Sequence, residues 1–553
     1  MPTLNFSYND LCQLIGKKIE KKRLEELILL NKGEVEDWKG DEMTVEVTSD
    51  RIDLLSVEGI ARALKGFLEI ELGIPKYPVQ ESNVRLTVDE EVNQVRPFVV
   101  SGIIEDVELT DTSVAQLMQM QEKLHATHCR NRRKASIGLH DLDKIKPPII
   151  YTAKRPDEIY FIPLQETKAM DGKEILRKVK KGVAYASLIR DSPLYPVIID
   201  SEETFLSLPP IINSVDTAVD PDTKNLFFEI TCLDEQVART ALNVLLCNIC
   251  ERKGTIKTVE IEYYDGRIVN LPDLTPQNWI LHLDYTNQIL GLNLNLNELN
   301  KLIKKSRMES NQKDRNTVEV FVPPFRSNIL HEIDLIEDVS IAYGYNKYVT
   351  KLPKVITIGK EDKKAIFTRK IRELMVGFGF QEISNYIMTN KEHLFSNMNL
   401  DEIEIVEIAN PVSTTFSVLR NNLIPSMLNF LQNNLHAMYP QKIFEAGDVV
   451  IVDKKAQTKT KTMRKLCAAI TAYSISFENI QAVLFSLLQN LGLKNLELTP
   501  KEHNSFIQGR VAEIHVNGEN IGIIGEISIP VLKNFALENP VALFEIELDQ
   551  LLK

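Results

Sequence analysis

In this chain of 553 residues, the clearest candidate for a site of chemistry is a group of three closely spaced acidic side chains, Asp334, Glu337 and Asp338. Their i, i+3, i+4 spacing places all three carboxylates on one face of a helix. Carboxylate oxygens are hard ligands of the kind that Mg²⁺ prefers. Acidic residues are also favoured near a helix N-terminus by the helix dipole, without any metal. Spacing alone favours this second interpretation.

A second pattern of polar residues surrounds the strand-like run from 225 to 231. Alternation predicts one apolar face and one face that mixes an aromatic ring with polar groups. The mixed face comprises Asn225, Phe227, Glu229 and Thr231. Upstream, Asn213, Ser214 and Thr223 add polar groups beside the rigid Pro209-Pro210 pair. A pocket wall and a solvated strand face both have this pattern, and the sequence leaves the two interpretations equally open.

Two pairs of metal-binding residue types are interpreted as structural. Cys247 and Cys250 lie in a helical run with no second pair and no nearby histidine, so we expect both to face a core. His125 and His128 are one turn apart on a predicted helix over 115–128, and we expect a solvated surface or one that faces RNA. The chain has no GxxxxGK[ST], GxGxxG or HExxH motif, so it offers no self-contained ATP site.

Composition limits the class of protein. The net charge of −12 argues against a surface that binds nucleic acid everywhere. A basic tract at 130–134 is most simply a solvated surface run. No apolar run approaches the ~20 residues that span a bilayer, and the start lacks the apolar core of a secretory signal. With six scattered cysteines, these features predict a cytoplasmic protein.

The elements that must position these residues form an α+β multidomain chain. Alternation predicts a strand over 43–47 and an amphipathic helix from Ser56. Further along, the sequence pattern predicts two short helices within residues 283–305. It also predicts a helix over 332–344, which carries the acidic residues. Proline-rich segments mark the breaks between units. The predicted domain boundaries are 1–82, 84–268, 276–352 and 358–553.

Three stretches together resemble the β-subunit family of phenylalanine–tRNA synthetase in its archaeal and eukaryotic form. They are ASIGLHDLDKIKPP (135–148), PPFRSNILHEIDLIEDVSIAYGYN (323–346), and NPVSTTFSVLRNNLIPSMLNFLQNN (410–434) followed by KIFEAGDVV. The opening SDRIDLLSVEGIARAL (49–64) is similar to the family's N-terminal helix and strand module. The resemblance runs in order along the whole chain, so it is specific.

The resemblance implies an α subunit as partner, in an (αβ)₂ assembly that acts on tRNA(Phe) and uses ATP at the α subunit. It implies that 358–553 is a catalytically inactive class II synthetase-like domain built on an antiparallel sheet. Neither fRxE nor GxGxxER occurs there, and in KIFEAGDVV no arginine precedes Glu445. We expect this domain to scaffold the α subunit.

The resemblance also implies that 84–268 is an editing domain, which hydrolyses tyrosine wrongly attached to tRNA(Phe). One hydrophobic pocket rejects an added hydroxyl poorly, so a second site that binds that hydroxyl is useful. Glu229 or Asp234 would accept a hydrogen bond from the phenol, and a positioned water would attack. The family's usual glycine–threonine pair is Cys232-Leu233 here, which affects the placement of Asp234. The candidate pocket residues are Asn213, Ser214, Thr223, Asn225, Glu229, Thr231 and Asp234.

For 276–352 the resemblance implies a small winged-helix-like module whose acidic helix binds a structural Mg²⁺ next to the α subunit. This favours the metal interpretation of Asp334, Glu337 and Asp338. Asn328 stands where the family usually has the fourth ligand, an aspartate. An amide carbonyl can still ligate, but one formal charge is lost, so we expect weaker affinity.

Two other interpretations remain open. One is a stand-alone tRNA-binding or trans-editing protein without a catalytic partner. The other is a scaffold whose editing pocket has decayed. A free-standing editor has no use for a large inactive synthetase domain, and the polar groups retained over 213–234 argue against decay.

Overall fold

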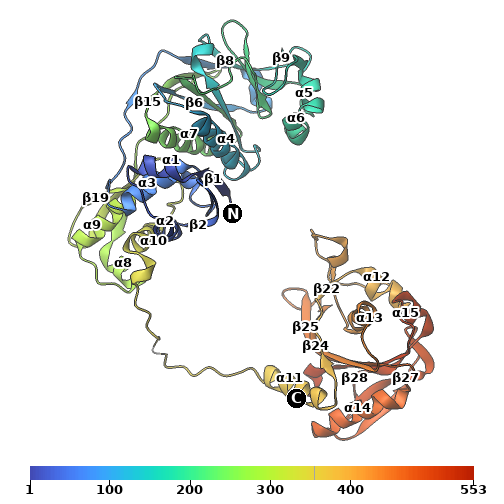
Figure 1. The fold of residues 1–553 in the computed structure, drawn as a ribbon. Coiled ribbons are helices and arrows are strands. Elements are labelled where there is room, and N and C mark those ends of the chain that lie inside the picture. Colours follow the sequence, from blue (N-terminus) through green and yellow to red (C-terminus); the bar gives the residue numbers. More distant parts are fainter. Residues whose placement is uncertain (354, 553) are drawn as a thin grey trace. The chain divides into compact units, whose positions relative to one another are not determined.

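A computed structural model describes residues 1–353 and 355–552 of the chain (Figure 1). It consists of two compact units, Met1–Lys351 and Leu352–Lys553, each built around its own cores. The prediction of a multidomain chain with mixed helices and sheets is confirmed. Among the described residues, no helix has the length and apolar character that crossing a membrane requires.

The chain opens with a three-stranded antiparallel sheet in the order β1-β3-β2, covered by helices. Its strands are β1 (Thr3–Ser7), β2 (Gly33–Lys39) and β3 (Glu42–Val47), and its helices are α1 (Tyr8–Ile15), α2 (Lys21–Leu30) and α3 (Val57–Phe67). Strand β3 alternates strictly, with Met43, Val45 and Val47 buried. Helix α3 begins where the Ser56 hydroxyl accepts a hydrogen bond from the Gly59 amide. The predicted strand and helix are both confirmed.

Besides a two-stranded sheet of β9 (Tyr160–Phe161) and β10 (Met170–Asp171), residues 79–271 contain two large sheets. One has five strands in the order β4-β15-β6-β14-β7, and the other has seven in the order β13-β12-β11-β8-β5-β16-β17. The first comprises β4 (Val79–Gln80), β6 (Phe98–Glu105), β7 (Ala135–Asp141), β14 (Leu226–Cys232) and β15 (Thr255–Lys257). The second comprises β5 (Arg85–Val88), β8 (Ile149–Lys154), β11 (Tyr195–Ile199), β12 (Phe205–Leu208), β13 (Ile212–Asn213), β16 (Val259–Tyr263) and β17 (Ile268–Leu271).

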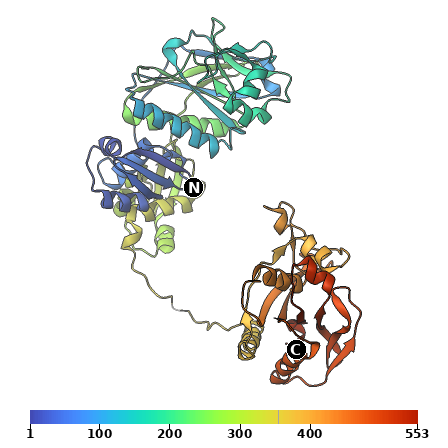
Figure 2. The same cartoon turned by 45° about the vertical axis from the view of Figure 1, so that its right-hand side comes forward.

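Two long helices, α4 (Asp111–Ala126) and α7 (Glu235–Ile249), lie side by side along the five-stranded sheet (Figures 1 and 2). Gly102, which pairs with Phe228 across the ladder, lies directly beneath Leu246 of α7. The face of β14 that carries Phe228 therefore packs toward α7. It is the apolar face predicted from the alternation along this strand, opposite the mixed face of Glu229.

Residues 277–343 combine a small sheet, β18-β20-β19, with three helices. The strands are β18 (Gln277–His282), β19 (Glu309–Gln312) and β20 (Thr317–Val322), and the helices are α8 (Leu283–Leu290), α9 (Leu296–Lys305) and α10 (Glu332–Tyr343). All three predicted helices are present. Module 277–343 packs against the N-terminal module so closely that a Cβ on Gly66 of α3 would lie 2.3 Å from the Lys305 carbonyl oxygen.

The second unit is built on a seven-stranded sheet in the order β21-β24-β25-β29-β28-β27-β26. Only β21 (Gln381–Glu382) pairs in parallel, with β24. The other strands are β24 (Gln441–Val452), β25 (Thr460–Thr471), β26 (Leu496–Pro500), β27 (Phe506–Val516), β28 (Glu519–Ile527) and β29 (Val541–Glu547). Helices α11 (Lys363–Gly377) and α14 (Phe477–Asn490) share one core with the sheet, and α13 (Ile424–Asn433) shares a second. Leu466 and Cys467, adjacent on β25, enter opposite cores, so the sheet is covered on both faces.

Candidate functional site

Glu229 lies in the middle of a fully buried central strand. β14 pairs with β6 on one side and β7 on the other, and all seven of its residues are buried. The mixed face of this strand is turned toward the seven-stranded sheet, where the Ser207 hydroxyl donates to Glu229 Oε1 at 2.9 Å. The interpretation of this face as a solvated surface is therefore excluded.

The Glu229 carboxylate is left with unused hydrogen-bonding capacity next to a histidine. His140 Nε2 lies 3.8 Å from Glu229 Oε1, and the two side chains are 0% and 3% exposed. His140 Nδ1 is held by the Thr217 hydroxyl at 2.8 Å. Among the described residues, neither His140 Nε2 nor Glu229 Oε2 has a hydrogen-bond partner. Buried polar groups are nearly always paired, so an orphaned atom on each of two adjoining side chains indicates a place for a ligand group or water.

Gly138 makes the room for this carboxylate. It pairs with Glu229 across the β7–β14 ladder. A Cβ at this position would lie 2.0 Å from Glu229 Oε1. Any larger residue would therefore displace the carboxylate from the position in which Ser207 holds it.

Thr231 continues the same face and is fixed by a buried arginine. Arg96 Nε donates to the Thr231 hydroxyl at 3.1 Å, and its Nη2 donates to the Thr231 and Arg132 carbonyls. The Tyr151 hydroxyl donates to the Arg96 carbonyl at 2.7 Å. Burial lowers the pKa of the Arg96 guanidinium. Thr231 and Arg96 thus extend the buried polar layer along the strand.

The predicted residues upstream of the strand hold the loops around β7. Asn213 Nδ2 donates to the Leu139 carbonyl at 3.1 Å, so it lies beside the strand that carries His140. The Ser214 hydroxyl is bound to Asp216, and the Thr223 hydroxyl donates to Asp141 at 3.0 Å. Asn225 donates to Asp143 at 2.7 Å, at the partly exposed end of the strand.

Asp234 lies beyond the other end of β14. Its carboxylate caps α7 by accepting from the Val237 amide, and it pairs with Lys134 at 2.9 Å. The bond from Lys134, followed by that from Val237, lowers the pKa of Asp234. Cys232 remains in the ladder, opposite Ala135, and the exposed Leu233 forms the turn into the helix. Asp234 is therefore engaged at a helix N-terminus, while Glu229 is not.

Sequence reasoning missed His140, Ser207 and Gly138. A signal for two of them was present, because Gly138 and His140 are two residues apart in a strand-like stretch and must share a face. Ser207 carried no signal, since the packing of one sheet against the other brings it to Glu229.

Two smaller expectations also need correction. His125 is not on a solvated or RNA-facing surface, because it is 1% exposed and its Nε2 accepts from the Ile137 amide at 2.8 Å. Arg132 in the basic tract is buried too, with Nη1 donating to the Ile211 carbonyl at 2.8 Å. Cys247 is buried as predicted, and Cys250 at the end of α7 is only partly buried.

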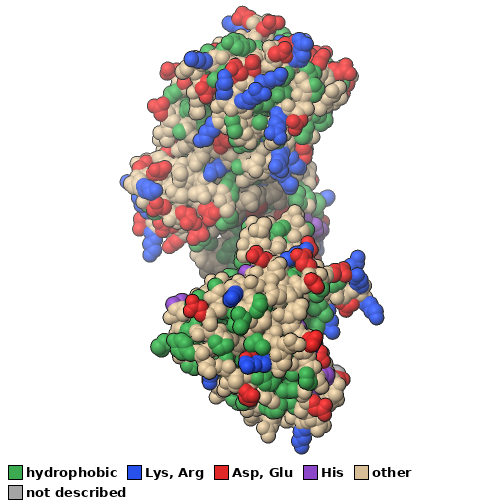
Figure 3. Space-filling model, turned by 90° about the vertical axis from the view of Figure 1, so that its right-hand side faces the viewer, with side chains coloured by type: hydrophobic (Ala, Val, Ile, Leu, Met, Phe, Trp, Pro, Cys, Tyr) green, Lys and Arg blue, Asp and Glu red, His purple; other side chains and the backbone are tan. Residues whose placement is uncertain are grey.

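Lysine and arginine side chains lie among acidic ones on the face of the first unit shown in Figure 3.

The acidic residues of α10 share a helix as predicted, but each has its own partner. Asp334 Oδ2 accepts from the Leu330 and His331 amides at 2.7 and 2.8 Å. Glu337 pairs with Lys32 of the N-terminal module at 2.8 Å. Asp338 pairs with Arg326 at 2.5 Å, and Arg326 Nε donates to Asn328 Oδ1 at 2.9 Å. No cluster of three or more acidic, histidine or cysteine side chains suited to a metal occurs among the described residues. In this arrangement the four predicted ligands do not fit a magnesium ion.

In the second unit, two of the stretches that resemble the family meet in a buried ion pair. Arg420 from the stretch 410–434 binds Glu445 of β24 at 2.7 Å, and the two side chains are 3% and 4% exposed. Asn385 donates to the other Glu445 oxygen at 2.8 Å. Glu445 is thus occupied by groups of its own chain.

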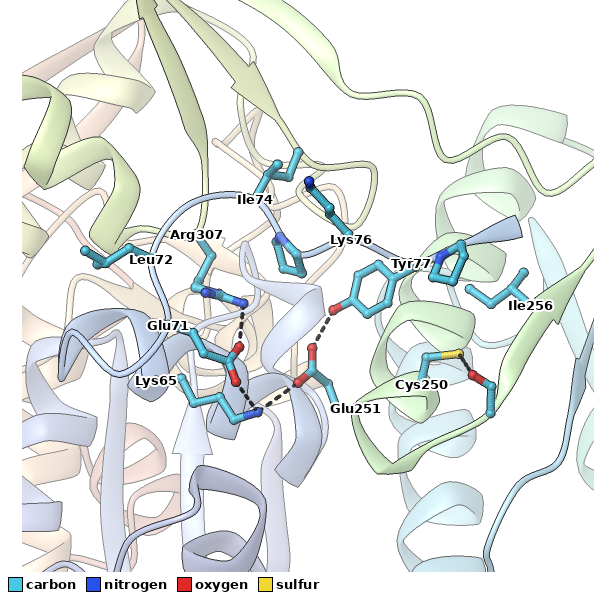
Figure 4. Close-up of a pocket in the computed structure, with 13 residues that line it drawn as sticks. Lys65, Glu71, Leu72, Ile74, Lys76, Tyr77, Cys250, Glu251, Ile256 and Arg307 are labelled. Carbon is cyan, nitrogen blue, oxygen red and sulfur yellow. Dashed lines mark hydrogen bonds and ion pairs between the residues drawn. The ribbon is translucent and has the colours of Figure 1, made fainter. Parts of the chain in front are cut away.

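The first unit also has a cavity of about 580 Å³ where its modules meet (Figure 4). Most of its charged groups pair with one another: Lys65 and Arg307 pair with Glu71, and Glu251 pairs with Lys65 and accepts a hydrogen bond from the Tyr77 hydroxyl. None of the residues predicted from the sequence to form a site lines this cavity.

Comparison with known proteins gives matches along the whole chain. Three family models match: the phenylalanyl tRNA synthetase beta chain CLM domain over residues 349–548, the tRNA synthetase B5 domain over 280–345, and the B3/4 domain over 108–248. The phenylalanine–tRNA ligase beta subunit of Korarchaeum cryptofilum is 42% identical over 551 residues, which are 99% of this chain and 98% of the relative. That of Pyrococcus horikoshii is 43% identical over 552 residues, 99% of each.

A solved structure is also similar. It is the crystal structure of an N-terminal fragment of the phenylalanyl-tRNA synthetase beta subunit from Pyrococcus horikoshii. The match has a TM-score of 0.60 and 41% identity, and it covers 62% of this chain and 100% of the fragment.

Proposed function

The chain belongs to the family of phenylalanine–tRNA ligase β subunits, and from this premise we propose that its middle domain hydrolyses tyrosine from mischarged tRNA(Phe). As part of the α/β enzyme it serves the attachment of phenylalanine to tRNA. In the proposed (αβ)₂ complex, the α subunit carries the aminoacylation site and uses ATP with its magnesium. The complex works in the cytoplasm, where its tRNA is. A stand-alone protein is not favoured, because the named relatives are β subunits over their full length.

We assign the work to four domains with the boundaries that the sequence predicts. Residues 1–82 and 276–352 form the N-terminal and winged-helix-like modules, 84–268 form the editing domain, and 358–553 form the inactive class II-like domain. The buried Arg420–Glu445 pair supports the last assignment, because an arginine committed to a carboxylate of its own chain is not free to bind ATP phosphates.

The observation that carries the editing proposal is the pair of orphaned atoms, Glu229 Oε2 and His140 Nε2. A phenolic hydroxyl has one hydrogen to donate and lone pairs to accept with. It would donate to the carboxylate and accept from the imidazole, in the tautomer that carries its hydrogen on Nε2. Phenylalanine would leave both atoms unpaired in a buried site, which is unfavourable.

The chemistry would then be hydrolysis by a positioned water. Ser207, the nearest hydroxyl to Glu229, donates to the carboxylate and therefore does not form a serine–histidine nucleophile pair. The role of Glu229 and His140 in this proposal is to select and hold the tyrosyl group. Thr231 and Asn213 would complete the wall, while Ser214, Thr223 and Asp234 would shape the loops and the helix around it. Asn225, which bonds to Asp143 at the partly exposed end of the strand, would lie outside the pocket.

A deacylation assay tests this proposal. The subunit is reconstituted with its cognate α subunit and given preformed Tyr-tRNA(Phe). Glu229→Ala should slow deacylation at least about tenfold, because a hydrogen bond to a charged group contributes about 1.5–3 kcal/mol. Phenylalanylation should be unchanged, and Tyr-tRNA(Phe) should accumulate when tyrosine is supplied.

Asn225→Ala is the matched control, because this side chain lies on the same strand face but bonds to Asp143 at the partly exposed end. It should deacylate at the wild-type rate. An equal loss of deacylation in Glu229→Ala and Asn225→Ala would mean that the pocket is not centred on Glu229. Wild-type deacylation by Glu229→Ala would contradict the proposal. If the wild-type complex itself does not deacylate Tyr-tRNA(Phe), the domain is a scaffold whose editing pocket has decayed.

A further inference from the structure

Arg326 lies where a cation held by the predicted magnesium ligands would have to lie. Its guanidinium donates to Asn328 Oδ1 at 2.9 Å and to Asp338 Oδ2 at 2.5 Å. The Arg326 and Asp338 side chains are only 1% and 6% exposed. A metal could reach both oxygens only after Arg326 left, and separating a buried ion pair is strongly unfavourable.

The surroundings are crowded and already rich in positive charge. Arg51 and Arg62 of the N-terminal module line the same gap as Arg326 and Asp338, and that gap measures about 20 Å³. Such a gap holds about one water, whereas Mg²⁺ usually keeps several of its own. Burial raises the pKa of Asp53 beside them, but Arg51, Arg326 and Arg62 together bring it down to about 2. A divalent ion here would face four guanidinium groups, those of Arg51, Arg62, Arg307 and Arg326, and two carboxylates.

The other two acidic residues of α10 are neutralised separately. Lys32 Nζ lies 2.8 Å from both Glu337 and Asp50, and its side chain is 16% exposed. Asp334 accepts two backbone amides at the start of α10, which is the role that the helix dipole favours there. The three carboxylates therefore face three different partners, and Asn328 contributes no charge.

We propose that this chain closes the junction between its N-terminal module and α10 with its own cations, Arg326 and Lys32, and binds no divalent ion at the four predicted ligands. Arg326 replaces the metal at Asp338 and Asn328. Lys32 replaces it at Glu337 and ties α10 to the neighbouring module. This inference does not depend on editing activity.

Manganese binding tests the absence of the metal. Mn²⁺, used as a paramagnetic substitute for Mg²⁺, is titrated into the full complex with the α subunit in the absence of ATP, and free Mn²⁺ is measured by electron paramagnetic resonance. Wild type, Asp334→Asn and Glu337→Gln should give the same binding curve, since any Mn²⁺ bound lies elsewhere. A site present in wild type and lost in both variants would overturn the proposal and establish the magnesium site predicted from the sequence.

Thermal unfolding of the same complex tests the role of Lys32. Lys32→Gln should lower the midpoint by about 2 °C or more, while Lys18→Gln, at an exposed lysine of the same module, should leave it unchanged. Replacing MgCl₂ with EDTA should not change the unfolding midpoint of wild type or of either variant. A drop with EDTA in wild type, or equal midpoints for the two variants, would contradict the lysine-and-arginine junction.

Discussion

At the scale of single residues, the buried carboxylate of Glu229 depends on the absence of a side chain at Gly138. The nearest atoms to a Cβ there belong to the Glu229 side chain, with Oε1 at 2.0 Å. Gly138→Ala should therefore move the carboxylate and break its bond to Ser207, with an overpacking penalty of about 1–3 kcal/mol. Because a side chain yields rather than the backbone, the fold should survive.

The expected result for Gly138→Ala is slow deacylation of Tyr-tRNA(Phe) together with normal phenylalanylation by the complex. Both rates can be measured on one preparation. A variant that edits at the wild-type rate would show that the position of the Glu229 carboxylate does not matter for editing.

His125 makes the folded first unit sensitive to mild acid. Burial, assisted by Arg132 and opposed by Glu122, lowers the pKa of His125 to about 4, whereas an unperturbed histidine titrates near 6.5. The folded state therefore disfavours protonation, and its stability is complete above about pH 6.5 and falls as the pH drops toward 4. The full loss would be about 3 kcal/mol.

Urea unfolding between pH 7 and pH 5 measures this effect. His125→Gln keeps an acceptor near the Ile137 amide but cannot titrate, so its stability should depend less on pH than that of wild type. Parallel pH profiles for the two proteins would refute the assignment to His125.

Sequence could predict the faces of these residues but not their partners. Alternation placed Glu229 and Thr231 together, and helical spacing placed Asp334, Glu337 and Asp338 on α10. Whether Glu229 meets Ser207, or Asp338 meets Arg326, depends on the packing of segments far apart in the chain. The same long-range packing buries His125, which the local pattern placed on a surface.

At the scale of elements, periodicity predicted β3, α3 and the three helices of 277–343, because each has a regular apolar pattern of its own. It could not predict that β14 lies between β6 and β7. Strand partners and register are fixed by contacts across the sheet, to which the sequence of one strand gives no guide.

Close strand packing in the second unit gives a prediction at this scale. A Cβ on Gly522 of β28 would lie 2.0 Å from the Glu545 carbonyl oxygen of β29, and this obstacle is backbone. Gly522→Ala should therefore destabilise the sheet by about 2 kcal/mol or more. A lower thermal midpoint of the subunit would be the direct sign.

Gly377 is the matched control, because it closes α11 of the same unit and a Cβ there meets nothing within 4 Å. Gly377→Ala should be neutral or stabilise by about 0.5–1 kcal/mol, since alanine is the better helix former. Equal midpoints for the two variants would show that the β28–β29 contact is not tight.

At the scale of the whole molecule, the chain joins two kinds of structure. The first unit carries the candidate editing site, and the second is a sheet covered on both faces whose buried Glu445 is held by Arg420. The resemblance read from the sequence gave the family, and the matches along 99% of the chain confirm it. Physical patterns alone would have stopped at a multidomain protein with a candidate metal helix and a candidate pocket.

The role of this chain as a β subunit is tested most directly by phenylalanylation of tRNA(Phe) with three preparations: this chain alone, the cognate α subunit alone, and the two mixed. We predict activity only in the mixture, because the class II motifs are absent from this chain and we propose that the α subunit needs this chain as a scaffold. Activity of the α subunit alone at the rate of the mixture, or no activity in a mixture of folded subunits, would contradict this prediction.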